Sequence, residues 1–241
     1  MTFIRSLVFL IALALTVIAY GSVILVGARF ASATALHRVA RGWSRTVLAL
    51  LRWICGLSYR IRGLENLPEQ PSVLMCKHQS AWETIALPGV LPVAQAWVLK
   101  RELVGIPFYG WALRALVPIP IDRGAARAAL KQLLSEGADR LSSGRSVLIF
   151  PEGTRVALGE HRPFSIGGAM LAHKEGAPVV PIAHNSGVFW DRRGILRRPG
   201  CIDIVIGEPI FASGLSAKEI NRIAEDWINA TVASLPTSRA E

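Results

Sequence analysis

A histidine and a glutamate lie five positions apart in the stretch CKHQSAWET, residues 76–84. His78 can take up a proton near neutral pH, and the Glu83 carboxylate can hold the imidazole in one tautomer and stabilise the charge that it gains. Side chains five apart on a regular helix diverge by about 140°, so the two meet only if His78 precedes a helix and Glu83 lies in its first turns. Taken alone, a surface histidine beside a helix-capping glutamate is the simpler interpretation.

A second candidate is the sequence FPEGTR at residues 150–155, which directly follows an apolar run. Its proline and glycine predict a tight turn. In such a turn the backbone N–H groups, the Thr154 hydroxyl and the Arg155 guanidinium can converge on an anion such as phosphate. A strand-to-loop turn with a solvated arginine explains the motif equally well when it is considered alone.

Other chemistries lack the residues that they require. His161, His173 and His184 do not have metal-ligand spacing, so we expect scattered surface histidines and no metal site. Ser165 lies in FSIGG, which is not the G-x-S-x-G turn of a serine hydrolase, and no glycine-rich nucleotide loop occurs. The three cysteines show no C-x-x-C spacing, which favours a reducing, cytoplasmic location over a disulfide framework.

Short apolar runs alternate with helical patterns after residue 63. Buried strands are predicted at residues 72–76, 96–100, 146–150, 177–183 and 201–210. The best amphipathic helices are predicted at residues 125–141 and 216–234. This alternation predicts an α/β fold with a mixed, largely parallel sheet flanked by helices.

Three polar clusters, KHQSAWE, DRG and FPEGTR, are in positions that follow apolar runs of the sequence. In open α/β sheets ligands gather beyond the carboxyl ends of strands. If the strands are neighbours, one crevice is expected to collect five side chains: His78, Glu83, Arg123, Glu152 and Arg155.

The N-terminal segment is strongly apolar. Residues 7–26 carry no charge, and this length is close to that needed to cross a hydrocarbon core as a helix. A cleaved signal peptide is the competing interpretation, but the run exceeds the usual h-region of about 7–15 residues, so we expect a retained anchor. One arginine precedes the run and several follow it, which predicts that the rest of the chain faces the cytoplasm at a bacterial inner membrane.

The composition agrees with a membrane location. The chain is 51% hydrophobic and carries a net charge of +10, which favours an anionic membrane surface over nucleic acid as the partner. Residues 43–63 mix apolar side chains with arginines at helical spacing, and are expected to pack on the first helix or to lie in the interface. The predicted organisation is membrane-anchoring helices at residues 1–62 and an α/β domain at 63–241, with the first helix either spanning the bilayer or lying flat.

Four motifs in this order resemble those of the lysophospholipid acyltransferase family. That family carries H-x4-D, then an arginine-containing block, then F-P-E-G-T-R, then V-P followed by hydrophobic residues. Here HQSAWE, IPIDRG, FPEGTR and VVPIA occur in the same order, and the resemblance covers roughly residues 64–209. The departure is Glu83, which stands where the family usually has aspartate and adds one methylene.

The resemblance implies a direct acyl transfer, with His78 as general base and Glu83 as its carboxylate partner in an α/β acyltransferase domain. Positions implicated in binding the acceptor, with the arginines near its phosphate, are Arg123, Glu152, Gly153, Thr154 and Arg155, with Lys100 as a further positive charge. No cofactor or metal is implied, because acyl-CoA or acyl-carrier protein acts as co-substrate. The implied partners are a lysophospholipid acceptor, the acyl donor and membrane lipid, and not nucleic acid.

The reaction implied by the resemblance is acylation of the sn-2 hydroxyl of 1-acyl-glycerol-3-phosphate, which gives phosphatidate in phospholipid synthesis. Three alternatives stay open. The acceptor can be another lysolipid, such as lyso-ornithine lipid, or water can replace the acceptor in a membrane thioesterase. A non-catalytic membrane-binding module is the third alternative, and it leaves FPEGTR unexplained.

Overall fold

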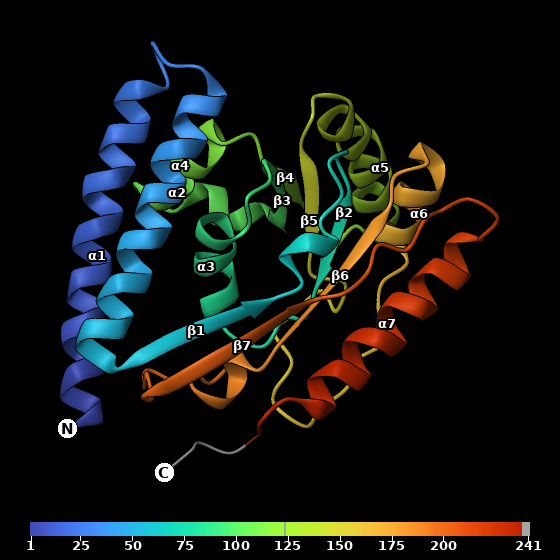
Figure 1. The fold of residues 1–241 in the computed structure, drawn as a ribbon. Coiled ribbons are helices and arrows are strands. Elements are labelled where there is room, and N and C mark those ends of the chain that lie inside the picture. Colours follow the sequence, from blue (N-terminus) through green and yellow to red (C-terminus); the bar gives the residue numbers. More distant parts are fainter. Residues whose placement is uncertain (123, 238–241) are drawn as a thin grey trace.

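A mixed, largely parallel sheet forms the centre of the computed structural model, which describes residues 1–122 and 124–237 (Figure 1). Within these residues the strand order is β1-β7-β6-β2-β5-β3-β4. The strands are β1 (Leu57–Arg62), β2 (Val73–Cys76), β3 (Gln95–Lys100), β4 (Ile119–Ile121), β5 (Ser146–Ile149), β6 (Val179–His184) and β7 (Gly200–Ile206). The β6–β7 pair is antiparallel and the other neighbouring pairs are parallel, so the predicted α/β fold class is confirmed.

Helices cover both faces of the sheet (Figure 1). They are α1 (Thr2–Gly27), α2 (Ala33–Leu50), α3 (Trp82–Val90), α4 (Tyr109–Ala115), α5 (Ala126–Ser142), α6 (Gly167–Glu175) and α7 (Ala217–Ser234). Helices α1, α2 and α3 pack in one hydrophobic cluster with one face of the sheet, and α5, α6 and α7 pack in a second cluster with the other. The molecule therefore has three layers.

The central strands are apolar on both sides because both faces are covered. In β2, Leu74 and Cys76 face the α1–α3 cluster, whereas Val73 and Met75 face the α5–α7 cluster. This alternation follows the two-residue period of a strand. It explains why these segments appear in the sequence as continuous apolar runs.

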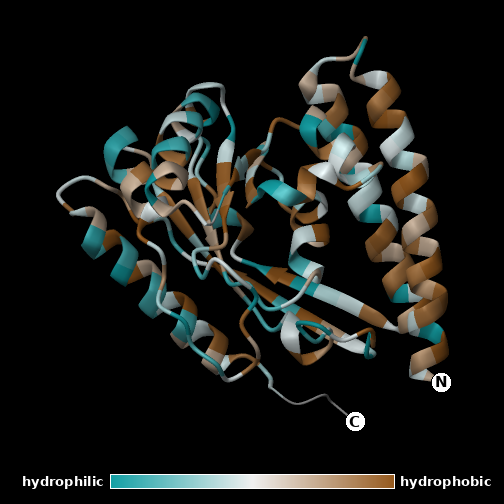
Figure 2. Cartoon of the chain, turned by 180° about the vertical axis from the view of Figure 1, so that it is seen from behind, coloured by the Kyte–Doolittle hydropathy of each residue, from teal (hydrophilic) through white to brown (hydrophobic). Residues whose placement is uncertain are grey.

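Helix α1 is held against the rest of the fold near both of its ends. Near the N-terminus, the Ser6 hydroxyl accepts a hydrogen bond of 2.8 Å from the Arg197 backbone N–H, and Phe9 is fully buried. Near the C-terminus, Gly21 packs closely on Phe108. The outward face carries exposed Ile, Leu, Val and Phe residues along its length. The hydropathy colouring in Figure 2 shows that most of this helix is hydrophobic. Among the described residues, α1 is the one helix long and apolar enough to cross a membrane.

The segment at residues 43–63 departs from the helical pattern expected for it. Helix α2 packs on α1, which is the first of the two arrangements expected for this segment. It continues into a short π-helix, Leu51–Cys55. Gly56 then adopts a left-handed φ of 67°, and β1 begins. The helical expectation is wrong beyond Cys55, because these residues pair with β7 and the Arg60 guanidinium contacts the Asp203 carboxylate at 2.9 Å.

Candidate active site

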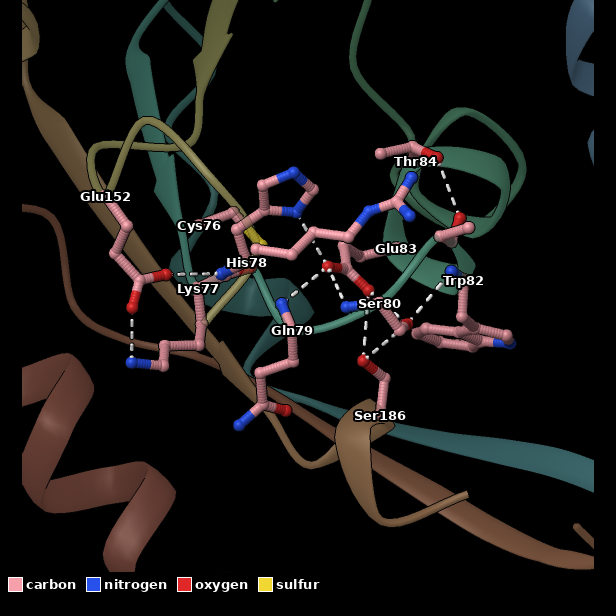
Figure 3. A network of polar contacts seen from close by, with 12 residues as sticks. Cys76, Lys77, His78, Gln79, Ser80, Trp82, Glu83, Thr84, Glu152 and Ser186 are labelled. Atoms are coloured by element: carbon pink, nitrogen blue, oxygen red, sulfur yellow. Dashed lines mark hydrogen bonds and ion pairs between the residues drawn. The ribbon is translucent and has the colours of Figure 1, made fainter. Parts of the chain in front are cut away.

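Three chain segments meet at one edge of the sheet. Strands β2, β5 and β6 are parallel neighbours, so the residues that follow each of them lie at the same edge. These segments are residues 77–83, 150–156 and 184–188. The close-up in Figure 3 shows side chains from all three in one network of polar contacts. The crevice predicted beyond the carboxyl ends of the strands is therefore built here.

His78 and Glu83 are in direct contact. The Nδ1 atom of His78 lies 2.8 Å from Oε1 of Glu83. His78 precedes α3 and Glu83 lies in its first turn, which is the arrangement that their spacing required. The imidazole also stacks on the Phe150 ring, with centroids 4.1 Å apart. Packing and a carboxylate together fix the orientation of the imidazole.

The Glu83 carboxylate is fully buried and receives hydrogen bonds on both oxygens. Oε1 accepts from the backbone N–H groups of Gln79 and Ser80, each at 2.8 Å. Oε2 accepts from the Ser80 hydroxyl at 2.7 Å and the Ser186 hydroxyl at 3.0 Å. Burial raises the pKa of Glu83, but His184 and the hydrogen bonds from His78 and Ser80 outweigh it, so the pKa lies well below its ordinary value.

An ionised Glu83 selects one tautomer of His78. An ionised carboxylate can only accept hydrogen bonds. The Nδ1 atom of His78 therefore carries a hydrogen and donates the hydrogen bond to Glu83. The lone pair is then on Nε2. His78 lines a cavity, and an unprotonated imidazole nitrogen of this kind can take a proton from a hydroxyl.

The structure corrects the expectation that His184 lies on the surface, because this residue is fully buried at the end of β6. Its Nδ1 atom accepts from the Ser186 N–H at 3.3 Å, and its Nε2–H donates to the Lys77 carbonyl at 2.8 Å. Burial lowers the pKa of His184, against the opposing effect of the Glu83 charge. Its position just after VVPIA, at the end of a predicted strand, was the available signal. His161 and His173 are exposed, as expected.

Glu152 lies beside His78, but its carboxylate is buried and occupied. Its Oε1 atom is 2.5 Å from Nζ of Lys77, and its Oε2 atom accepts from the His78 backbone N–H at 2.8 Å. Burial raises the pKa of the Glu152 carboxyl, against the opposing effects of Lys77 and His78. Glu152 thus ties the FPEGTR turn to the backbone of His78. Lys77 was not singled out from the sequence, although a lysine directly after a buried strand was a possible signal.

The remainder of the FPEGTR turn faces outward or lines the cavity. Gly153 has a φ of 70°, which favours glycine, and Thr154 is exposed. Arg155 lines the same cavity as His78, and its guanidinium donates to the Arg192 carbonyl at 3.3 Å. Burial raises the pKa of the Tyr109 hydroxyl above its ordinary value, and the charge of Arg155 opposes this rise.

Two further candidate residues stand apart from this network. Lys100 lies at the end of β3, lines the cavity and forms an exposed ion pair of 3.0 Å with Glu102. Arg123 lies outside the described residues. Of the predicted site residues, the structure therefore brings His78, Glu83, Glu152 and Arg155 together and places Lys100 at the cavity wall.

The cavity beside His78 has a volume of about 590 Å³, a size typical of sites for small molecules. It extends between strand β3 and helices α1 to α4 and is mostly apolar. Apolar side chains that line it include Leu13, Val17, Ile85, Trp97 and Leu99. His78 and Arg155 are among its polar lining residues. One cavity therefore combines a histidine, a cation and an apolar surface.

Comparisons with known proteins identify the family of this chain. A model of the acyltransferase family matches residues 58–185, a range that contains both His78 and the FPEGTR turn. A curated 1-acyl-sn-glycerol-3-phosphate acyltransferase of Pseudomonas aeruginosa is 44% identical over 96% of this chain and 91% of its own length. The enzyme of that name from Saccharomyces cerevisiae is 28% identical over 76% of this chain, which spans 61% of the yeast protein.

A solved structure shows the same fold. The crystal structure of the 1-acyl-sn-glycerophosphate acyltransferase PlsC from Thermotoga maritima superposes with a TM-score of 0.82, covering 100% of this chain and 98% of that one. The two sequences are 22% identical, so this likeness concerns the fold alone. The match over residues 58–185 and the identity to the Pseudomonas protein establish the relationship. This chain belongs to the acyltransferase family.

Proposed function

We propose that this protein transfers an acyl chain from a thioester donor to the sn-2 hydroxyl of 1-acyl-glycerol-3-phosphate, giving phosphatidate. The observation that carries the proposal is the contact between His78 and the buried Glu83 at the wall of an apolar cavity. The name of the Pseudomonas relative, which is 44% identical, supports the choice of acceptor. Acyl-CoA and acyl-carrier protein both present the thioester that this reaction needs.

The reaction begins when Nε2 of His78 removes the proton from the acceptor hydroxyl as its oxygen attacks the thioester carbonyl. The tetrahedral intermediate collapses, the C–S bond breaks, and the thiolate takes the proton back from His78. Glu83 orients the imidazole and stabilises the imidazolium between these steps. The acyl group passes directly from sulfur to oxygen, with no covalent enzyme intermediate.

The acceptor phosphate is assigned to the cationic side of the cavity. Arg155 lines the cavity together with His78, and its guanidinium can form two parallel hydrogen bonds with a phosphate. Thr154 is exposed next to it, and Lys100 lies on the same cavity wall. Glu152 and Gly153 shape the turn that presents these groups, because the Glu152 carboxylate is occupied by Lys77 and the His78 N–H.

Transfer to a panel of lysolipid acceptors, with and without a phosphate, tests this assignment. In Arg155→Gln, we expect the KM for 1-acyl-glycerol-3-phosphate to rise about 10-fold to 100-fold, since a hydrogen bond to a charged group contributes about 1.5–3 kcal/mol. Phosphate-free lysolipids, including lyso-ornithine lipid, should show no such change. Transfer is measured with purified protein and labelled acyl-CoA or acyl-carrier protein. The matched control is Arg162→Gln, in an exposed loop.

Three results of this panel would contradict, in turn, the proposed acceptor, the proposed reaction and the assignment of the phosphate to Arg155. Transfer only to phosphate-free lysolipids would indicate a different acceptor. Free fatty acid released without any dependence on a lysolipid would indicate a thioesterase. An unchanged KM in Arg155→Gln would remove Arg155 from the phosphate site while leaving the reaction itself in place.

For the membrane, we propose that α1 lies in the interface of the cytoplasmic leaflet and does not span the bilayer. The helix packs on the domain at Ser6 and Phe9 near one end and at Gly21 near the other. A spanning helix would have to pull these contacts, and the domain attached to them, into hydrocarbon. The exposed apolar face of α1 is then the surface that inserts into the membrane.

Charging this face should release the protein from membranes. Leu7 is 50% exposed and Leu15 is 62% exposed, so we expect Leu7→Asp/Leu15→Asp to fold but to lose vesicle binding at least tenfold in a flotation assay. Transfer to a water-soluble, short-chain acceptor should be retained. Lys131→Asp, at an exposed position of α5, is the control and should float like the unmutated protein. Retained flotation of the double variant would contradict the proposal.

A further inference from the structure

The buried carboxylate of Glu83 bridges two parts of the fold. Its Oε1 atom is held by the His78 ring and by backbone N–H groups directly before α3. Its Oε2 atom is held on the other side by Ser186, which lies in the turn that follows β6. Figure 3 shows Glu83 between His78 and Ser186. One side chain therefore connects the α3 segment to the end of a neighbouring strand.

The length of the glutamate side chain matters for this bridge. Aspartate on the same backbone would draw the carboxylate back by about 1.5 Å, the length of one carbon–carbon bond. The Ser186 hydroxyl is already 3.0 Å from Oε2, close to the outer limit for an O–H···O hydrogen bond. The contacts to residues 78–80 are local to the start of α3, whereas Ser186 is fixed to the sheet. An aspartate that keeps the local contacts therefore loses Ser186.

His184 fixes Ser186 in place. The Ser186 N–H donates to Nδ1 of His184 at 3.3 Å, and the Nε2–H of His184 donates to the Lys77 carbonyl at 2.8 Å. Lys77 directly precedes His78, so the contacts close a ring that runs through His78, Glu83, Ser186 and His184. Of these, Glu83, His184 and Ser186 are each 0% exposed. This ring of contacts holds His78 in two ways: through the backbone at Lys77 and through its carboxylate partner Glu83.

We propose that Ser186, braced by His184, is a positioning residue that adapts this active site to a glutamate at position 83. The inference rests on the proposed function, because it concerns how His78 is held for acyl transfer. Ser186 touches neither the substrate nor the reacting atoms. It sets the depth of the carboxylate, and the carboxylate sets the orientation of the imidazole.

A double-mutant cycle tests the proposal. In the unmutated protein, Ser186→Ala should lower kcat for acyl transfer about tenfold and leave the KM for the acceptor unchanged. In the Glu83→Asp protein, whose kcat we also expect to be reduced, adding Ser186→Ala should change kcat less than twofold. The ratio of these two effects, fivefold to tenfold, corresponds to a coupling of about 1.0–1.4 kcal/mol. The same cycle in the free energy of unfolding should be non-additive, and this readout needs no activity.

The matched control is Ser72→Ala. Ser72 is also buried and its hydroxyl lies 3.3 Å from that of Ser146, but it precedes β2 at the opposite edge of the sheet. This variant should alter stability without altering kcat, and its effect should add to that of Glu83→Asp. Equal losses from Ser186→Ala in the unmutated and Glu83→Asp proteins, in kcat and in stability, would overturn the inference. An unmutated protein without transfer activity would instead overturn the proposed function.

Discussion

Replacing His78 by alanine is expected to lower kcat for acyl transfer about 10³-fold without unfolding the protein. A positioned general base contributes about 10²-fold to 10⁴-fold to a rate. The Nδ1 atom of His78 is held by Glu83 at 2.8 Å and its ring stacks on Phe150. The effect is measured as single-turnover transfer from labelled thioester to 1-acyl-glycerol-3-phosphate.

The control for this variant is His161→Ala. His161 is exposed in a loop, so its removal should leave both kcat and the thermal midpoint unchanged. A second check is binding, because His78→Ala should retain affinity for the acceptor, whose phosphate is assigned to Arg155. A His78→Ala protein that transfers at the unmutated rate would rule out His78 as the base. A loss of activity together with a collapsed thermal midpoint would point to structure and not to proton transfer.

The contact between His78 and Glu83 could be predicted because the constraint is local. Five positions of separation allow a contact only when a helix begins between the two residues, and α3 does begin there. The edge of the sheet was predictable too, since buried strands end immediately before KHQ and before FPEGTR. Both inferences use information from adjacent residues.

The partners of Glu152 and Glu83 were not predictable in the same way. Lys77 meets Glu152, and Ser186 meets Glu83, only because β2 lies between β5 and β6 in the sheet. Strand order is set by packing across the whole domain, and the periodicity of a single segment carries no record of it. His184 was misplaced for the same reason, because a lone histidine after a strand looks solvent-facing until its neighbours are known.

Strand β1 shows the opposite case, in which a local pattern misled. Residues 43–63 mix apolar side chains with arginines at helical spacing, and residues 57–62 follow a true helix in that segment. Pairing with β7 overrides that pattern, and Arg60 opposite Asp203 makes a cross-strand ion pair. The sheet therefore begins at Leu57, inside the segment expected to be helical anchor, while the division into anchor and domain stays a prediction.

The buried Lys77–Glu152 pair is expected to contribute strongly to the free energy of unfolding. In Glu152→Gln we expect the free energy of unfolding to fall by about 3–5 kcal/mol, because Lys77 would be left buried without a counter-charge. The Lys77 side chain is 2% exposed and the Glu152 side chain 0%, so water cannot solvate either charge. The measurement is denaturant unfolding of the detergent-solubilised protein, with the midpoint and slope fitted together.

A second variant separates the charge from the shape of the turn. In Lys77→Met/Glu152→Gln the unpaired ammonium is gone and the glutamine oxygen can still accept from the His78 N–H, so most of the lost stability should return. Asp226→Asn, which breaks the exposed Arg222–Asp226 pair, is the surface control and should cost less than about 1 kcal/mol. If the double variant is no more stable than Glu152→Gln, the loss comes from the FPEGTR turn itself. If it recovers stability but not kcat, the charged Lys77–Glu152 pair is needed to hold the backbone of His78 in place, because in that variant both charges have gone while the hydrogen bond to the His78 N–H remains.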